Sequence, residues 1–314
     1  MSHAPASCNA RTGQWHLRGD KHDSLGTIVV LSGYVSVMTL IGKEQALIAW
    51  LTKRRRVAIG FSGGVDSAYL AAVTLEALGR DHSLAIIGRS ESLAGREEDH
   101  AAVVARAIGI PIYQVDTGEL SDPRYAANPS NRCYFCKSVL WDTLRPIATQ
   151  RGFETLVDGT NADDLHDFRP GAKAATEQGV ESPLAAVGLT KPEIRQLTKE
   201  RGWPWWDRPA APCLASRLPH GTAVTAERLR QVDVAESGIR DLGVKGNLRV
   251  RHYGELAKVE MDLDILPRWR EGAAFAALEA AVRAAGFTRL ELDARGFRSG
   301  SLNVLDGGAA LPGH

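Results

Sequence analysis

The sequence lacks the features that define several protein classes. No apolar run approaches the ~20 residues of a transmembrane helix, and four cysteines in 314 residues are too few for a disulfide scaffold. The 38 basic and 37 acidic residues nearly cancel, so no global positive field attracts nucleic acid. The N-terminal residues contain no apolar segment typical of a secretory signal. We therefore expect a soluble cytoplasmic protein without a membrane or nucleic-acid partner.

Short apolar runs alternate with amphipathic stretches from residue 57 onward. The composition, 44% apolar and 24% charged, is that of a globular protein long enough for two domains. The pattern predicts strands at 57–61, 84–87, 112–115 and 155–157, and helices at 66–78, 96–108 and 137–149. This alternation indicates a doubly wound α/β domain, a parallel sheet with helices on both faces.

A Pro- and Gly-rich stretch, residues 203–221, ends this pattern. Beyond it the sequence predicts helices at 225–237 and 273–285 and strands at 248–251, 257–261 and 289–292. Adjacent strands flanked by helices indicate a smaller C-terminal α+β domain. We predict a disordered extension at 1–37, the α/β domain at 38–217, and a substrate-binding or oligomerisation domain at 218–314.

A glycine-rich turn, Ser62-Gly63-Gly64-Val65-Asp66-Ser67, joins the first predicted strand to a helix. Glycines let the backbone approach an anion, the hydroxyls of Ser62 and Ser67 can donate to phosphate oxygens, and the helix N-terminus adds free N–H groups. Asp66 can cap the helix or help to hold Mg²⁺. No lysine follows the glycines, which excludes the G-x-x-x-x-G-K-[ST] loop. The turn predicts an ATP phosphate site; a serine-capped turn without a ligand is the alternative.

Polar residues follow two other predicted strands. Ser90 and Ser92 come after the second strand, and Thr160 and Asn161 after the fourth. Ligands of doubly wound sheets bind beyond the carboxyl ends of the strands. We therefore expect Ser90, Thr160 and Asn161 to contact the nucleotide, with ordinary polar loops as the alternative.

Three cysteines stand in the periodic part of the chain. Cys133 and Cys136 form a Cys-x-x-Cys pair, and Cys213 follows much later. Such a pair fits half a zinc site, a redox pair, two ligands of an iron–sulfur cluster, or coincidence. No second pair exists, which excludes a closed four-cysteine zinc site. For Cys213 the alternative is a buried structural thiol.

Five ordered motifs together resemble the LarE family, over roughly residues 38–292. They are Asn131-Arg132-Cys133-Tyr134-Phe135-Cys136-Lys137, Asp158-Gly159-Thr160-Asn161-Ala162-Asp163-Asp164, Arg169-Pro170-Gly171, Ser182-Pro183-Leu184 and Cys213-Leu214-Ala215-Ser216-Arg217. The glycine-rich turn likewise resembles the S-G-G-x-D-S loop of PP-loop (N-type) ATP pyrophosphatases, which cleave ATP between the α and β phosphates.

The LarE family consists of ATP-dependent pyridinium-3,5-biscarboxylic acid mononucleotide sulfurtransferases, which help to build the nickel-pincer nucleotide of lactate racemase. The resemblance implies that a substrate carboxylate is adenylated, that sulfur attacks the acyl adenylate, and that a thiocarboxylate is released. It assigns catalytic roles to Asp66 and Cys213, requires ATP and Mg²⁺, and implies a homo-oligomer. Adenylation is chemically sensible because a carboxylate is a poor electrophile and an acyl adenylate is a good one.

The family has two sources of sulfur. In one branch the cysteine at the position of Cys213 gives up its own sulfur and becomes dehydroalanine. A second branch resembles three-cysteine tRNA thiolases, in which three thiolates hold a [4Fe-4S] cluster whose fourth iron can carry a sulfide. Cys133, Cys136 and Cys213 match the second pattern, so we expect a cluster that is reloaded by sulfide or another sulfur donor. A sacrificial Cys213 is the alternative.

Arg249 and Arg251 lie two residues apart on a predicted strand and therefore share a face. Guanidinium groups suit a phosphate, and the LarE substrate is a mononucleotide. We expect Arg217, Arg249 and Arg251 to bind the substrate phosphate; a solvated strand face is the alternative.

Two other functions compete with this reading. One is a tRNA thiolase or another N-type ATP pyrophosphatase, for which a net charge of +1 offers weak support. The other is a non-catalytic regulator that binds a nucleotide or an iron–sulfur cluster. The intact glycine-rich turn argues against such a degenerate protein.

Overall fold

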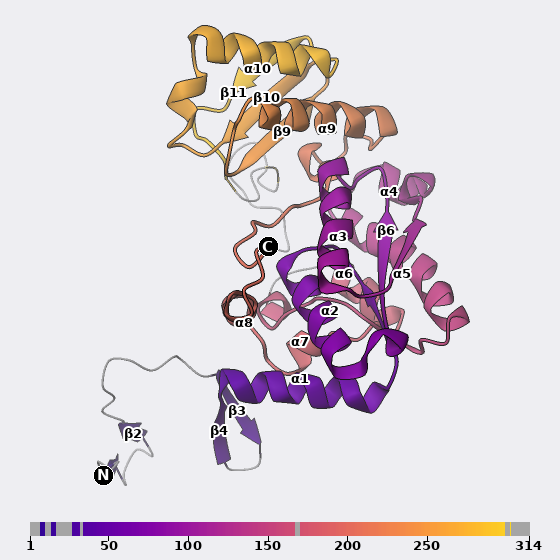
Figure 1. Ribbon diagram of the computed structural model, residues 1–314. Helices are drawn as coiled ribbons and strands as arrows, with labels where there is room; N and C mark the ends of the chain where they lie inside the picture. Colours follow the sequence, from indigo (N-terminus) through magenta and orange to yellow (C-terminus); the bar gives the residue numbers. More distant parts are fainter. Residues whose placement is uncertain are drawn as a thin grey trace. The chain divides into compact units, whose positions relative to one another are not determined.

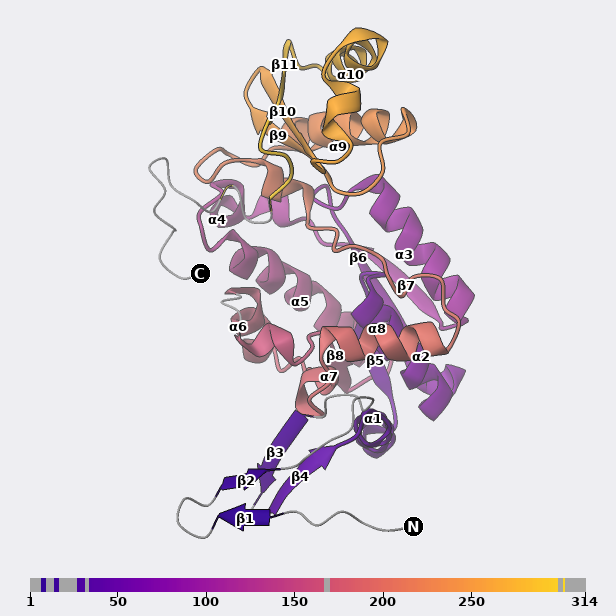
Figure 2. The same ribbon diagram turned by 90° about the vertical axis from the view of Figure 1, so that its left-hand side faces the viewer.

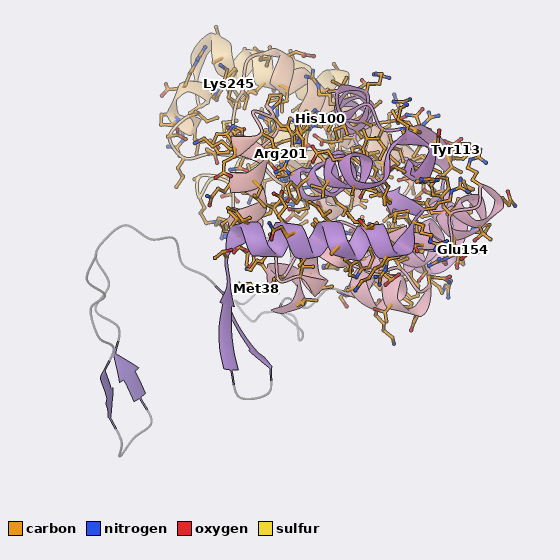
Figure 3. The ribbon with its side chains drawn as sticks, turned by 60° about the horizontal axis from the view of Figure 1, so that its bottom comes forward. Met38, His100, Tyr113, Glu154, Arg201 and Lys245 are labelled. Carbon is orange, nitrogen blue, oxygen red and sulfur yellow. The ribbon has the colours of Figure 1, made fainter. Side chains whose placement is uncertain are left out.

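The structure is a computed structural model that describes residues 7–9, 14–16, 27–31, 34–166, 170–298 and 302. Side chains are described for residues 38–165, 170–298 and 302, and Figure 3 shows them from Met38 onward. The chain divides into two units, Met1–Gly42 and Lys43–His314, which we describe separately.

The first unit contains two antiparallel strand pairs. Strand β1 (Ser7–Asn9) pairs with β2 (Gln14–His16), and β3 (Thr27–Leu31) pairs with β4 (Tyr34–Met38). The other residues of the extension that we predicted to be disordered, 1–37, lie outside the described residues. The predicted domain boundaries stay predictions.

A four-stranded parallel sheet, in the order β7-β6-β5-β8, forms the centre of the second unit (Figures 1 and 2). Its strands are β5 (Val57–Gly60), β6 (Ser83–Arg89), β7 (Ile112–Asp116) and β8 (Thr155–Val157). The parallel pairing confirms the doubly wound α/β fold. The carboxyl ends of all four strands, and the loops that follow them, therefore meet at one edge.

Helices cover both faces of this sheet. α2 (Val65–Leu78) and α3 (Gly95–Ile108) lie on one face, and α5 (Arg132–Gln150) lies on the other (Figure 2). Alternate strand residues point to α5, as the pleat requires. The core on that side is formed by Ala58, Leu84, Ile86, Leu156, Trp141, Leu144 and Ala148.

Helix α5 begins five residues earlier than the predicted helix at 137–149. The backbone N–H of Arg132 donates to the carbonyl of Pro129, and that of Tyr134 donates to the carbonyl of Asn131. These bonds close the preceding turn and start the helix. Cys133 and Cys136 therefore lie within the first five residues of α5 and not in a loop before it.

Several other elements were not predicted. The helices are α1 (Leu40–Arg54), α4 (Pro123–Ala126), α6 (Pro170–Glu177), α7 (Pro183–Ala186) and α8 (Lys191–Glu200). The 3₁₀ turns are η1 (Arg80–His82), η2 (Glu119–Ser121), η3 (Asp163–His166), η4 (Leu214–Arg217) and η5 (Leu266–Trp269). Helix α8 starts with a capping box between Thr190 and Glu193, a signal that the sequence does contain.

A smaller sheet in the C-terminal part has the strand order β11-β10-β9 (Figure 1). β9 (Leu248–Tyr253) is antiparallel to β10 (Leu256–Met261), and β11 (Arg289–Leu292) is parallel to β10. Helices α9 (Ala226–Asp241) and α10 (Gly272–Ala284) pack with it, in the α+β arrangement that was expected. Among the helices of the described residues, none combines the length and apolar character of a membrane span.

Candidate active site

The glycine-rich turn is a compact segment between β5 and α2. Ser67 Oγ donates to the carbonyl of Gly64 at 3.1 Å, so the hydroxyl of Ser62, 3.1 Å from Ser67 Oγ, supplies the proton between them. Gly63 has φ +71°, and a Cβ there would lie 2.6 Å from the Cα of Ala101. Only glycine fits this position, because both its backbone conformation and its contact with α3 exclude a side chain.

The loop after β8 contacts the start of α2. A Cβ on Gly159 would lie 2.9 Å from the backbone nitrogen of Ser67, so the two loops touch there. Thr160 donates through its backbone N–H and its hydroxyl to Asp158, at 3.0 and 2.9 Å. Asn161 is buried, and its Oδ1 accepts from the N–H of Asp163 at 3.0 Å. Thr160 and Asn161 thus lie near the glycine-rich turn; Thr160 bonds within its own loop, whereas the side chain of Asn161 also interacts with Asp66.

Asp66 forms an ion pair that the sequence did not reveal. Lys191, at the start of α8, donates to its Oδ2 at 2.5 Å. Burial raises the pKa of Asp66 despite this lysine, and Asp164 adds to the rise. The other oxygen, Oδ1, is buried and has no hydrogen bond of normal length among the described residues, although the side chain of Asn161 lies close enough to lower the pKa of the carboxyl group. A carboxylate with such a buried oxygen and a second carboxylate nearby fits Mg²⁺, which prefers oxygen ligands.

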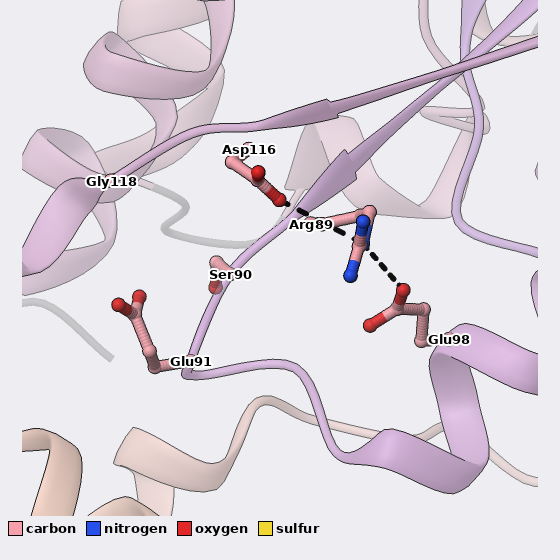
Figure 4. Close-up of a pocket in the computed structure, with 6 residues that line it drawn as sticks. All are labelled: Arg89, Ser90, Glu91, Glu98, Asp116 and Gly118. Carbon is pink, nitrogen blue, oxygen red and sulfur yellow. Dashed lines mark ion pairs between the residues drawn. The ribbon is translucent and has the colours of Figure 1, made fainter.

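Ser90 lines a pocket of about 300 Å³ at the carboxyl ends of β6 and β7 (Figure 4). Arg89 forms ion pairs there with Glu98 at 2.6 Å and with Asp116 at 3.7 Å. The hydroxyl of Ser90 lies 2.8 Å from that of Ser92 and also accepts from the N–H of Ser92. Ser90 therefore faces the edge where a nucleotide is expected, with its hydroxyl engaged inside its own loop.

The fold brings Cys213 towards the first turn of α5. The N–H of Leu214 donates to the carbonyl of Ser92 at 2.8 Å, and Arg132 donates to the carbonyl of Ala215 at 3.1 Å. These two bonds hold the turn that follows Cys213 against both the β6 loop and α5. Neither hydrogen bond could be predicted from the sequence, because the partners are 83 or more residues apart.

The three cysteines are close enough to influence one another. Cys133 is exposed as a whole residue, yet partial desolvation of its thiol raises its pKa, and the charge of Cys213 adds to the rise. Burial likewise raises the pKa of Cys136 to about 12, with Glu119 as the next cause. All three are free thiols. In the described part of the chain, no three His, Cys, Asp or Glu side chains are grouped to hold a single metal ion. A cubane cluster binds each cysteine to a different iron, so its ligands need not converge on one point.

The predicted phosphate arginines are buried and differ in their partners. Arg217 binds both oxygens of Glu236 at 2.8 Å, and Arg251 binds Glu260 at 2.8 Å. Arg249 is 8% exposed and has no carboxylate partner among the described residues. Burial, and then the charge of Arg217, lowers its pKa to about 10. None of the three lies on a solvated strand face. Arg249 is the one whose buried positive charge is not paired with a carboxylate of the described residues.

Arg217 and Arg251 also hold the turn that carries Cys213. Arg217 donates to the carbonyl of Cys213 at 2.9 Å, and Arg251 donates to that of Ser216 at 3.0 Å. Glu236, the partner of Arg217, accepts from the N–H of Val250 in β9 at 2.9 Å. The cysteine turn is thereby attached to the strand that presents Arg249.

A glycine-rich turn between a parallel strand and a helix, with a carboxylate and a lysine at its mouth, defines an ATP-using enzyme of the PP-loop class. Comparison with known proteins agrees. The family model described as NAD synthase matches residues 49–127, which contain this turn. The tRNA-specific 2-thiouridylase MnmA of Chlorobium luteolum is 26% identical over 179 residues, 48% of this chain and 49% of that protein.

Two relatives match most of the chain. An uncharacterized protein of Synechocystis sp. is 43% identical over 264 residues, 84% of this chain and 98% of the relative. The pyridinium-3,5-bisthiocarboxylic acid mononucleotide synthase of Lactiplantibacillus plantarum is 33% identical over 268 residues, 84% of this chain and 95% of the synthase. The chain therefore belongs to the LarE family of ATP-dependent sulfurtransferases.

Proposed function

We propose that this enzyme converts a carboxylate of pyridinium-3,5-biscarboxylic acid mononucleotide into a thiocarboxylate, in the biosynthesis of the nickel-pincer nucleotide. The observation that carries the proposal is the attachment of Leu214 to Ser92. That bond, 2.8 Å long, ties the cysteine turn to the edge of the sheet where ATP is expected. The similarity to the bisthiocarboxylic acid mononucleotide synthase supports the choice of acceptor.

ATP binds with its phosphates on Ser62, Gly63, Gly64 and Ser67, and Asp66 holds Mg²⁺. An oxygen of the acceptor carboxylate attacks the α phosphorus, the bond to the bridging oxygen breaks, and pyrophosphate leaves with that electron pair. Lys191, already beside Asp66, neutralises the negative charge that develops on the leaving group. Ser90, Thr160 and Asn161 contact the rest of the nucleotide.

Arg249 binds the phosphate of the acceptor mononucleotide. Its buried guanidinium lacks a carboxylate partner among the described residues and is repelled by the neighbouring Arg217 and Arg251. A phosphate monoester relieves that repulsion and accepts charge-assisted hydrogen bonds. Arg217 and Arg251 complete the positive environment, although each has its own carboxylate.

Cys133, Cys136 and Cys213 hold a [4Fe-4S] cluster in this proposal. Three free thiols whose charges influence one another, with no fourth cysteine among the residues whose side chains are described, support a cluster with one open iron. Such a cluster, when bound, supplies a sulfide for transfer. The alternative, in which Cys213 gives up its own sulfur, leaves Cys133 and Cys136 without a role. We also propose that the enzyme acts in the cytoplasm as a homo-oligomer.

Anaerobic purification followed by iron and sulfide analysis tests the proposal, together with pyrophosphate release in the presence of the acceptor. We expect iron, sulfide and acceptor-dependent pyrophosphate release. Each of Cys133→Ser, Cys136→Ser and Cys213→Ser should lose iron and sulfur transfer together. If only Cys213→Ser is inactive, and Cys213 of the iron-free enzyme becomes lighter by one H₂S after turnover, the sacrificial route is correct.

The same assay separates the competing functions. The similarity to MnmA makes a tRNA thiolase the main alternative, and such an enzyme would release pyrophosphate only with RNA. A regulator would release none with either acceptor.

A further inference from the structure

An aromatic ring covers the buried guanidinium of Arg249. The Cζ atom of Arg249 lies over the ring of Phe297, 5.2 Å from its centre. Arg249 is 8% exposed and donates to the carbonyl of Leu248 at 2.7 Å, but no carboxylate of the described residues pairs with it. The face of an aromatic ring carries partial negative charge and attracts cations. The ring of Phe297 therefore compensates part of the charge of Arg249.

The segment that follows β11 holds Phe297 in this place. The N–H of Asp293 donates to the carbonyl of Val259 at 2.9 Å, and the N–H of Phe297 donates to the carbonyl of Met261 at 2.8 Å. Both carbonyls belong to β10, so the segment is bound to that strand on either side of a turn. Within the turn, the N–H of Gly296 donates to the carbonyl of Asp293 at 3.0 Å.

This turn depends on the glycine before Phe297. Gly296 has φ +67°, and a Cβ there would lie 3.0 Å from the carbonyl oxygen of Met261. A side chain would therefore be strained by the backbone conformation and crowded by β10. Asp293, 4% exposed, accepts from the N–H of Arg295 at 2.9 Å within the same turn. The place of Phe297 against Arg249 is thus fixed by the backbone.

The ring of Phe297 is not part of the apolar core. The apolar cluster of the C-terminal part contains Phe287 and Trp269, and the described residues that form or flank it do not include Phe297. Phe297 is half-buried. A ring that is held against a cation, outside the core, favours a role in ligand binding over a role in packing.

The acceptor in the proposed function carries charges of both signs. Its phosphate suits the guanidinium of Arg249. Its pyridinium ring is permanently positive, because the sugar is attached to the ring nitrogen, and aromatic faces bind such ligand cations. Once the phosphate supplies Arg249 with an anion, the guanidinium depends less on the aromatic ring. The face of Phe297 can then receive the pyridinium.

We propose that Phe297 binds the pyridinium ring of the acceptor, so that Arg249 and Phe297 together select a mononucleotide with a cationic base. The inference rests on the proposed function, since it assigns a residue to the base of the same acceptor. A mononucleotide with a neutral base keeps the contact with Arg249 but loses the attraction to the ring of Phe297.

Calorimetric titration with two ligands of nearly the same shape tests this. One is pyridinium-3,5-biscarboxylic acid mononucleotide, and the other is its dihydropyridine form, obtained by borohydride reduction, in which the ring is neutral. We expect the unmodified chain to bind the pyridinium form about 3- to 30-fold more tightly, which corresponds to one cation–π contact. Phe297→Leu should weaken binding of the pyridinium form by about the same factor and change binding of the neutral form less than about twofold.

Phe297→Tyr is the matched control, because it keeps the aromatic face. It should bind both ligands within about twofold of the unmodified chain. Both substitutions keep a large apolar side chain, so urea unfolding of each variant should stay close to that of the unmodified chain. If Phe297→Leu does not fold, Phe297→Met provides the same test without an aromatic ring.

Three results overturn the proposal. Equal affinity of the unmodified chain for the two ligands means that the charge of the base is not recognised. An undiminished preference for the pyridinium form in Phe297→Leu means that another group recognises it. An equal loss of both ligands in the folded variant means that the ring only shapes the site.

Failure of the proposed function gives a different result. If the unmodified chain binds neither ligand and releases no pyrophosphate with the acceptor, the proposed function fails, and this inference fails with it. Acceptor-dependent pyrophosphate release together with equal binding of the two ligands would leave the proposed function standing and remove only the role of Phe297.

Discussion

Arg217 and Glu236 form a two-point ion pair, with Nε and Nη2 of the arginine each 2.8 Å from a different carboxylate oxygen. Arg217 is 4% exposed, and its remaining donors go to the carbonyls of Pro212 and Cys213. The pair therefore joins α9 to the turn that carries the candidate catalytic cysteine. The pair holds that turn in place.

Arg217→Ala should lower the free energy of unfolding by about 3–5 kcal/mol, because it leaves Glu236, only 14% exposed, without its cation. Arg217→Lys should recover part of this loss, since an ammonium group cannot make the two-point contact. Urea unfolding measures both. The control is Arg230→Ala, an exposed position of α9, with a change within about 0.5 kcal/mol. Equal stability of Arg217→Ala and Arg230→Ala would show that the pair does not hold the turn.

Asp66→Asn and Ser67→Ala should each lower pyrophosphate release about 100-fold or more while the protein stays folded, since we propose that Asp66 holds Mg²⁺ and that Ser67 binds the phosphates. A coupled assay for pyrophosphate measures this, with circular dichroism as the test of folding. Asp81→Asn, at an exposed position beyond the other end of α2, is the control and should keep full activity. Turnover retained in both active-site variants would remove the glycine-rich turn from the mechanism.

The buried position of Asp66 also predicts a pH dependence without metal. Its folded-state pKa lies above the ordinary carboxylate value, so the folded state binds the proton more tightly than the unfolded state. The free energy of unfolding should therefore fall as pH rises through the interval between these two values. Subtracting the curve of Asp66→Asn from that of the unmodified protein isolates this contribution. A difference that is flat, or that rises with pH, would contradict it.

Arg249→Gln and Arg251→Gln should separate binding from stability. Arg249→Gln should weaken binding of the pyridinium mononucleotide about 10- to 100-fold and leave ATP affinity and stability unchanged, because this guanidinium has no carboxylate partner in the described chain. Arg251→Gln should lower the free energy of unfolding by about 3 kcal/mol, because it removes the arginine that forms an ion pair with the buried Glu260. Calorimetric titration and urea unfolding measure the two effects. Equal loss of ATP and mononucleotide binding in folded Arg249→Gln would mean that the acceptor site is misplaced.

Cys136 of the iron-free enzyme should react slowly with iodoacetamide at pH 8. Burial raises its thiol pKa to about 12, so the reactive thiolate is scarce. The rate should increase about tenfold for each pH unit up to pH 10, as the thiolate fraction does. Peptide mass spectrometry follows the reaction, and the same protein in urea serves as the control because its thiol regains an ordinary pKa. Equal rates in native and unfolded protein would contradict the shift.

The sequence was sufficient for the parallel sheet and for the glycine-rich turn. Apolar runs such as 57–61 and 84–87 predict strands that are buried on both faces of a sheet. The glycines predict a backbone that turns sharply and passes close to another element. Both are local properties, because a few consecutive residues determine them. The structure agrees in the order β7-β6-β5-β8 and in the contact of Gly63 with Ala101.

The pairing of charged and polar side chains was decided by the tertiary structure. Lys191 reaches Asp66 across 125 residues, and Leu214 bonds to Ser92 only because the connector returns to the sheet edge. The sequence identified Arg217 and Arg249 as similar cations, yet one is neutralised by Glu236 and the other is not. Residue spacing along one strand or helix defines which side chains share a face, whereas the partner across a gap depends on how separate elements pack.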